Sequence, residues 1–341
     1  MKNLLKLLPV LALLACDENY PYRIGTFPEG QVTNLDQLNS EFDEMNSNYV
    51  SPYFTANLNF VFSSNATSKG QDFNLDARQL IFNQSKETFE ITHSAASVLG
   101  QNHVMRNQLF EINTDCDERG PYSIASDIQN FHFMLYSQDC DGISKILLNE
   151  FESKSQFEGY RAENFQVRLL GQNSNEMYPS FYGEKFLKGA DFVSQGNPEK
   201  LLFSSDLDGV FNIYEADIPS GKKGVEFLKD RAEKDIKKLS INTSSNDHMP
   251  FVYGDMLVFS SDRQGGLGGY DLYYSFKMGE GWSEPVNFGP SINSPQDEYR
   301  PVVSDHPEFS NRVMIFSSNR PGGLGGFDLY YVGVPRFYLR L

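Results

Sequence analysis

The fold is decided by the stretch 258–273, which reads VFSSDRQGGLGGYDLY. A second copy at 315–330 reads IFSSNRPGGLGGFDLY. In both copies an apolar run ends in Ser-Ser, and an aromatic residue stands eleven positions after the Phe. Two apolar runs joined by a glycine-rich connection are typical of a β-hairpin. Two copies this similar indicate an internal repeat.

Fainter copies extend the repeat toward the N-terminus. The copy 61–75 keeps the spacing, 202–214 shortens the connection by three residues, and 135–143 is the weakest. Each copy follows a proline that starts a short apolar segment. Proline is tolerated at the first residue of a strand. These prolines are Pro52, Pro121, Pro179, Pro250 and Pro301.

Each unit therefore predicts four short strands, repeated every 51 to 71 residues. A small sheet with two apolar faces needs neighbours on both sides, which a β-propeller provides. The 28 Phe, 18 Tyr and 27 Gly agree with an all-β chain of short strands and tight turns. Five units are led by proline, and 78–113 reads as a degenerate sixth, so five and six blades both remain open.

The repeats resemble a known family. The units FSSDRQGGLGGYDLY (259–273) and GWSEPVNFG (281–289) are similar to the WD-like β-propeller repeats shared with TolB, a periplasmic protein. The resemblance is strong over 178–331 and faint over 50–149. Many relatives continue into a peptidoglycan-binding domain resembling that of OmpA, whereas this sequence ends just after its last repeat. The resemblance implies a propeller in the cell envelope.

The first residues read as a lipoprotein signal. Lys2 and Lys6 precede a short apolar run that ends in Leu13-Leu14-Ala15-Cys16, similar to a lipobox. We expect residues 1–15 to be removed and Cys16 to carry a lipid that anchors the protein in the outer membrane. The periplasmic face and the cell surface both remain open as the side of that membrane. An ordinary signal with a chance cysteine is the alternative. The expected domains are a tether at 16–33, an amphipathic helix at 34–47 and the propeller at 48–341.

The charge and motifs exclude several kinds of function. The net charge of −16 includes Lys2 and Lys6, so the expected mature chain carries −18 and repels nucleic acid. The glycine-rich connections lead into strands rather than helices, which argues against a phosphate loop. The five scattered histidines and the lack of a GxSxG or HExxH motif predict no enzyme, metal or cofactor. Trp282 is expected to pack in the core rather than stack on a sugar.

Two cysteines remain for a disulfide. Cys116 and Cys140 flank two consecutive strands of one predicted blade, and we expect them to pair in an oxidising compartment. Two unpaired buried thiols are the alternative.

An acid stands three residues before the strand-opening proline in four units, namely Glu118, Glu176, Asp247 and Glu298, whereas the first unit has Tyr49. If these strands are innermost, the carboxylates surround one mouth of a central channel and make it negative. The alternative is that each carboxylate accepts backbone N–H bonds in the turn before its strand.

These features favour a non-catalytic envelope lipoprotein whose propeller binds other envelope proteins as a scaffold. This expectation rests largely on fold-level analogy. Two alternatives remain: a receptor for peptidoglycan or another glycan, and a propeller hydrolase or lyase that acts on glycans.

Overall fold

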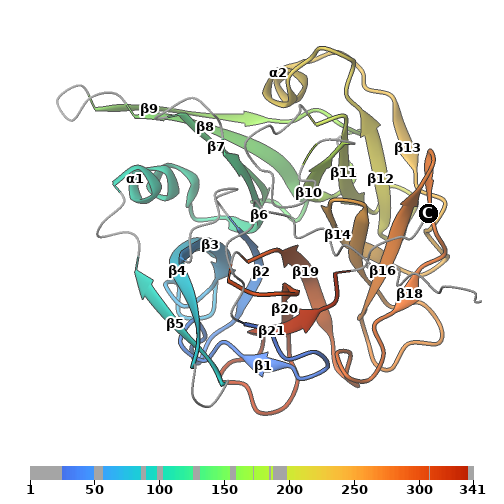
Figure 1. The fold of residues 1–341 in the computed structure, drawn as a ribbon. Coiled ribbons are helices and arrows are strands. Elements are labelled where there is room, and N and C mark those ends of the chain that lie inside the picture. Colours follow the sequence, from blue (N-terminus) through green and yellow to red (C-terminus); the bar gives the residue numbers. More distant parts are fainter. Residues whose placement is uncertain are drawn as a thin grey trace, which may run out of the picture.

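The computed structural model describes residues 25–49, 57–85, 90–97, 103–125, 131–153, 159–171, 173–183, 186, 198–306 and 308–336. They form five antiparallel sheets around one axis, a five-bladed β-propeller (Figure 1). The predicted fold is confirmed, with five blades. The first strand of each blade is innermost, since these strands contact one another around the axis.

The strands follow the blades in chain order. Blade 1 contains β2 (Glu44–Tyr49), β3 (Asn57–Ser64), β4 (Asn74–Gln84) and β5 (Ile91–Ser97), and blade 2 contains β6 (Asp117–Ala125), β7 (Phe131–Asp139), β8 (Lys145–Ser153) and β9 (Tyr160–Gln166). Blade 3 contains β10 (Glu176–Tyr182), β11 (Lys200–Ser205), β12 (Asn212–Asp217) and β13 (Ile236–Lys238). Blade 4 contains β14 (Asp247–Tyr253), β15 (Met256–Ser261), β16 (Asp271–Met278), β17 (Gly281–Trp282) and β18 (Val286–Asn287). Blade 5 contains β19 (Glu298–Ser304), β20 (Arg312–Ser318), β21 (Asp328–Val334) and β1 (Thr33–Asn34).

Two short helices lie outside the blades. Helix α1 (His103–Ile112) connects blades 1 and 2, and α2 (Gly224–Lys229) lies between β12 and β13. Within the described residues, no helix is long and apolar enough to span a membrane.

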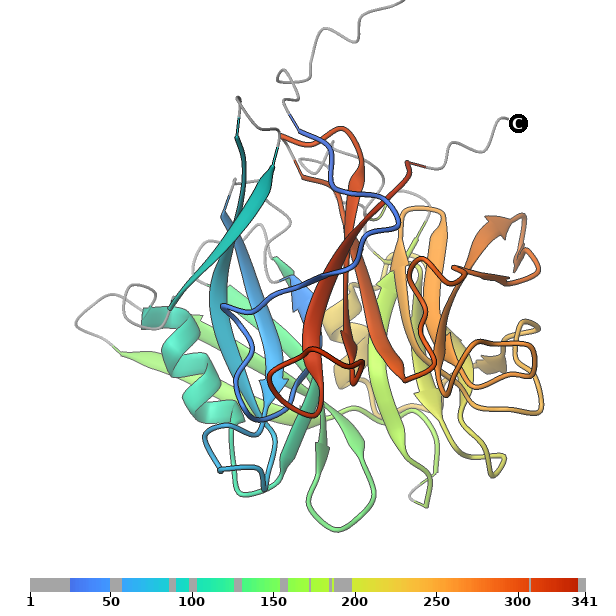
Figure 2. The ribbon, with the colours of Figure 1, turned by 90° about the horizontal axis from the view of Figure 1, so that it is seen from below.

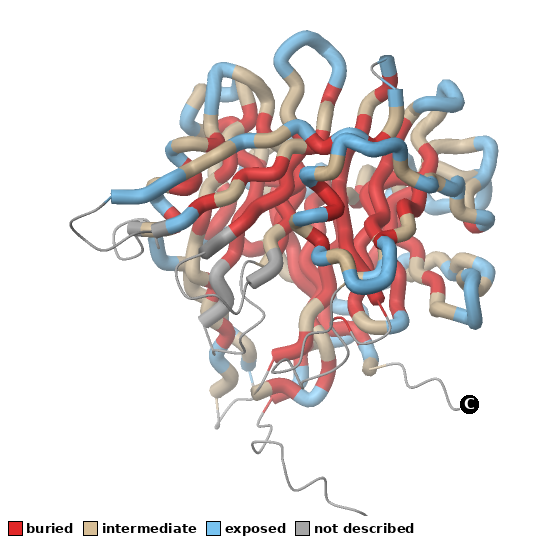
Figure 3. The backbone as a smooth tube through the Cα atoms, turned by 90° about the horizontal axis from the view of Figure 1, so that it is seen from above, coloured by how far each residue is buried: buried red, intermediate tan, exposed pale blue. Residues whose placement is uncertain are grey.

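The apolar runs are continuous because the blades cover one another. Every residue of β14 and β15 is buried, although alternate side chains point to opposite faces of a strand. A strand that is buried on both faces needs apolar residues at consecutive positions. Burial is accordingly concentrated in the strands, and exposure in the connections (Figure 3).

The N-terminal part of the chain closes the ring. Strand β1 pairs with β21, with Thr33 opposite Tyr331 and Asn34 opposite Tyr330. It supplies the fourth strand of blade 5, so the first and last described parts of the chain share one sheet. The propeller therefore begins at β1, earlier than the predicted boundary at residue 48.

The predicted helix at 34–47 is wrong. The segment forms the end of β1, a turn and the start of β2. Leu35, Leu38 and Met45 are buried, but Leu35 and Leu38 belong to a turn, in which the Leu38 and Asn39 N–H groups donate to the Leu35 carbonyl. Similar turns precede blades 4 and 5. Tertiary contacts determine the conformation of this segment, because the Leu35 N–H donates to the Leu329 carbonyl of β21 at 2.9 Å.

The degenerate sixth blade is also excluded. Within 78–113 the chain completes β4, forms β5 as the outer strand of blade 1, and continues into α1. The innermost strand of blade 1 is β2, so Ser47 takes the place of the proline and Glu44 the place of the acid. Pro52 lies outside the described residues.

Candidate functional site

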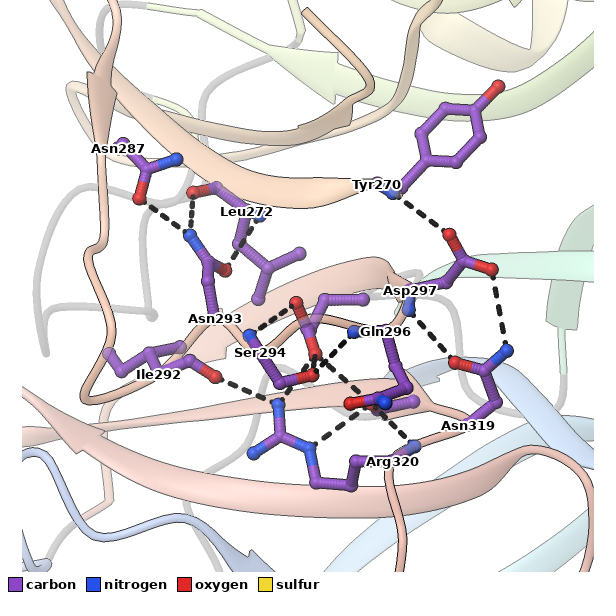
Figure 4. A network of polar contacts seen from close by, with 12 residues as sticks. Tyr270, Leu272, Asn287, Ile292, Asn293, Ser294, Gln296, Asp297, Asn319 and Arg320 are labelled. Carbon is purple, nitrogen blue, oxygen red and sulfur yellow. Dashed lines mark hydrogen bonds and ion pairs between the residues drawn. The ribbon is translucent and has the colours of Figure 1, made fainter. Parts of the chain in front are cut away.

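Every blade begins with a turn that a carboxylate closes. Glu298 accepts the Ser294 N–H at 3.0 Å, and the Ser294 hydroxyl also donates to it (Figure 4). The corresponding N–H bonds join Ser40 to Glu44 at 2.7 Å, Thr114 to Glu118 at 3.2 Å, Thr243 to Asp247 at 2.5 Å and, from a different turn position, Leu170 to Glu176 at 3.2 Å.

The same carboxylates have a second partner, which comes from the same blade for four of them and from β8 of blade 2 for Glu176 in blade 3. Arg320 lies 2.9 Å from Glu298, Lys145 lies 3.1 Å from Glu176, and Arg263 pairs with Asp247. Gln138 donates to Glu118 at 2.9 Å, and Ser64 donates to Glu44 at 2.9 Å. All five acids are at most 2% exposed, and burial raises the pKa of Glu44, Glu118, Glu176 and Glu298.

The structure therefore agrees with the alternative in which each carboxylate accepts backbone N–H bonds in the turn before its strand. Glu118, Glu176, Asp247 and Glu298 occupy equivalent positions on innermost strands, as the repeat predicts. Their carboxylates are held by the turns and by a cation or, at Glu118, by the Gln138 amide, so they do not present a negative mouth to solvent. Among the described residues, no three His, Cys, Asp or Glu side chains are placed to hold a metal ion.

The residue before each acid fastens its blade to the preceding one. Asp297 accepts the Tyr270 N–H at 2.9 Å (Figure 4). The Glu298 N–H donates to the Tyr270 carbonyl oxygen at 2.7 Å. The same pair of bonds recurs at the other four junctions, where the preceding blade contributes Phe73, Ser144, Phe211 and Phe327.

These junctions bring aromatic rings together at one end of the axis. Tyr299 stacks on Phe327 and meets Tyr270 edge-on, with both centroid distances 5.1 Å. Phe211 stacks on His248 at 4.0 Å. The rings of Phe211, Tyr270, Tyr299 and Phe327 are all partly exposed.

Carboxylates accompany these rings. Burial, with the negative charges of Asp262 and Asp297 nearby, raises the pKa of Tyr270 and Tyr299. Both tyrosines therefore remain neutral donors near neutral pH. We call this surface the axial aromatic face; it comprises Phe211, Asp262, Tyr270, Asp297, Tyr299 and Phe327.

The glycine-rich connections serve blade packing. A Cβ on Gly268 would lie 2.4 Å from the Pro295 carbonyl carbon, so only glycine lets the next blade approach this closely. The Asp271 carboxylate accepts the Leu267 N–H at 2.6 Å, and Asp328 does the same for Leu324. A carboxylate inside the hairpin disfavours phosphate there.

Cys116 and Cys140 form a disulfide, with Cα atoms 4.7 Å apart. It joins the start of β6 to the end of β7. We predict that replacing both cysteines with serine lowers the unfolding free energy by about 3 kcal/mol, since the bridge restricts the unfolded chain. Urea unfolding at equilibrium measures this loss. Equal midpoints with and without the bridge would contradict the prediction.

Trp282 packs between blades, as predicted. Its ring meets Tyr182 of blade 3 edge-on at 5.5 Å. The Lys277 ammonium lies 5.4 Å from the indole centroid. Trp282 is therefore part of the packing between blades 3 and 4.

Sequence reasoning missed the axial aromatic face, although its signal was present. An aromatic residue precedes Asn or Asp in four repeats, at Phe73, Phe211, Tyr270 and Phe327. This position looked like the start of a strand. Only the hydrogen bonds from this position to the following blade show that its aromatic rings lie close to the axis.

No protein-family model matches the chain, and no curated protein matches it. Several solved structures are similar to the chain. An α-L-arabinofuranosidase from Podospora anserina is 8% identical, with a TM-score of 0.48, over 92% of this chain and 98% of that one. An endo-arabinase from Bacteroides thetaiotaomicron is 14% identical, with a TM-score of 0.43, over 92% and 98%. The catalytic domain of a Coprinopsis cinerea α-L-arabinofuranosidase is 10% identical, with a TM-score of 0.49, over 92% and 96%.

These similarities contradict the expected non-catalytic scaffold and the expectation that the chain is not an enzyme. The similar structures are glycoside hydrolases. At 8 to 14% identity the similarity concerns the fold. What this chain binds has to be argued from its own residues.

Proposed function

We propose that this protein acts on carbohydrate and binds a glycan across the axial aromatic face. The observation that carries the proposal is the group of partly exposed rings beside carboxylates at the axis. Aromatic rings offer flat apolar surfaces for the C–H faces of sugars, while carboxylates and tyrosine hydroxyls can bond sugar hydroxyls. Acidic and aromatic groups together fit a neutral glycan better than an anionic one.

Two rings give the sharpest test of glycan binding. We expect Tyr299→Ala combined with Phe327→Ala to weaken binding at least tenfold, because the double change removes the stacked pair. Retention on a panel of immobilised plant and bacterial polysaccharides, followed by calorimetry with oligosaccharides, measures this loss. The matched control is Phe110→Ala, which removes a 77% exposed ring on α1.

The same glycans test for hydrolysis. Glycosidic cleavage generally needs two carboxyl groups on either side of the scissile bond. Release of reducing ends that the double variant abolishes would assign cleavage to this face. If the wild-type protein is retained by none of these glycans and releases no reducing ends from them, the proposal is contradicted.

The path of the N-terminal segment orients the molecule. Gly25 forms a bridge with Phe309 in the connection between β19 and β20, and the chain then runs along β21 to Leu35. The first described residues thus lie at the face opposite the hairpins that carry Tyr270 and Phe327 (Figure 2). If Cys16 carries a lipid, the membrane lies on the Gly25 side. The axial aromatic face then lies on the side of the propeller opposite the attachment point of this segment.

The lipid anchor has its own test. We predict that Cys16→Ala moves the protein from the membrane to the soluble fraction, because the lipid is the proposed attachment. Fractionation after a high-salt wash and mass spectrometry of the N-terminal peptide measure this change. Retention of Cys16→Ala in the outer membrane would contradict the anchor and leave the glycan proposal intact.

A further inference from the structure

The innermost strands share an unusual backbone position. The second residue after each acid has a positive φ, namely Asn46, Gly120, Tyr178, Met249 and Arg300, with values from 46° to 60°. A bulge at this point turns each strand at the same height around the axis. Four of these residues are not glycine, so the blade contacts hold them there.

Arg300 extends from this position across the axis. Its guanidinium donates to the carbonyl oxygens of Pro250 at 2.9 Å, Pro179 at 3.3 Å and Tyr178 at 3.5 Å. These carbonyls belong to the innermost strands of blades 3 and 4. Arg300 is 0% exposed, so its charge lies inside the propeller.

This cation has no carboxylate partner among the described residues. No ion pair there involves Arg300, and the five turn acids are bonded elsewhere. The three carbonyl dipoles offset only part of the positive charge of the Arg300 guanidinium. Burying an unpaired cation is costly, so such charges are usually paired.

Neighbouring polar groups add donors that lack acceptors. Buried atoms of Arg300 (Nε), Asn46 (Nδ2 and Oδ1) and Asn48 (Nδ2), with the Ser47 hydroxyl, have no hydrogen-bond partner within the described part of the chain, and all but the Asn46 Oδ1 are donors. Strand β2 lies beside blade 5, since the Asn46 N–H donates to Ser317 at 3.0 Å. The Arg300 guanidinium carbon lies 5.5 Å from the centroid of the Tyr178 ring. Asn46 and Arg300 occupy equivalent positions on the neighbouring innermost strands β2 and β19, so both side chains start at the same height around the axis.

We propose that the propeller axis holds a small monovalent anion, chloride, between Arg300 and the donors of 46–48. A halide accepts N–H and O–H bonds from several directions and neutralises the guanidinium. An anion of this kind would join blades 1 and 5, where the ring closes, to blades 3 and 4. The site is separate from the glycan face, and its failure would leave that proposal intact.

Thermal unfolding of the purified mature chain tests the site. At constant ionic strength, we expect the melting temperature to rise as sodium chloride or bromide replaces sodium gluconate. Chloride at a hundred times its dissociation constant would raise the folded-to-unfolded ratio about a hundredfold. Arg300→Met should remove this dependence, whereas Arg161→Ala, which changes an arginine with a 64% exposed side chain, should keep it.

Two further measurements cover the case in which Arg300→Met does not fold. Asn46→Asp supplies a carboxylate next to the axis, and it should fold and lose the halide dependence. A crystal grown in bromide should show an anomalous peak beside Arg300. Water-like density without an anomalous signal, together with equal melting temperatures in chloride and gluconate, would overturn the proposal.

Discussion

Gly325→Ala is expected to destabilise the protein by at least about 3 kcal/mol, the upper range of overpacking. A Cβ on Gly325 would lie 1.6 Å from the Phe42 carbonyl oxygen and 2.7 Å from its carbon. Both atoms are backbone, so no side-chain rotation relieves the clash. The contact joins the hairpin of blade 5 to the turn before blade 1, and the added methyl group therefore strains the closure of the ring. Equilibrium unfolding in urea measures the loss.

The matched control is Gly171→Ala, where an added Cβ meets nothing within 4 Å. Gly268→Ala tests whether the effect follows the repeat, since Gly268 meets the backbone of 294–296 in the same way. We expect Gly268→Ala to resemble Gly325→Ala and Gly171→Ala to change little. Equal stabilities of Gly325→Ala and Gly171→Ala would contradict the close approach.

The second large effect is expected from Glu298→Ala. This change leaves Arg320, whose side chain is only 16% exposed, without its carboxylate and removes the acceptor of the Ser294 N–H. Removing one partner of a buried pair typically costs about 3 to 5 kcal/mol. Combining Glu298→Ala with Arg320→Met should recover part of the loss, because no buried charge then remains. Denaturant unfolding of the single and double variants measures both effects.

A surface pair is the control for Glu298. Arg161 and Glu163 form an ion pair with side chains 64% and 37% exposed, so Glu163→Ala should cost at most about 1 kcal/mol. A cost for Glu298→Ala no greater than this would show that the turn does not depend on its carboxylate.

The pH dependence gives Glu298 a second measurement. Burial raises its pKa in the folded state, so the folded protein binds the proton more readily than the unfolded chain does. The stabilising contribution of this proton is present in acid and is lost as the pH rises through the folded pKa. Glu298→Gln removes this titration, and we expect a flatter stability profile above the ordinary glutamate pKa.

The sequence by itself determined the blade. The pattern in 258–273 specifies an apolar strand, a glycine-rich hairpin and a second apolar strand, and all of these contacts are local. The same local reasoning placed Cys116 and Cys140 on one blade, because both flank strands that follow one another in the chain. It also identified four of the acids and weighed their role in a turn.

Only the tertiary structure decided how the blades close and what lies at their axis. Thr33 pairs with Tyr331 across almost the whole chain, and no periodicity in 33–47 distinguishes such a strand from part of a helix. The repeat could not show that Tyr299 of one blade meets Tyr270 of the preceding blade. It also could not show that Arg300 reaches carbonyls of two other blades. Local patterns describe a strand and its neighbours in sequence, whereas these contacts arise from the arrangement of five sheets around one axis.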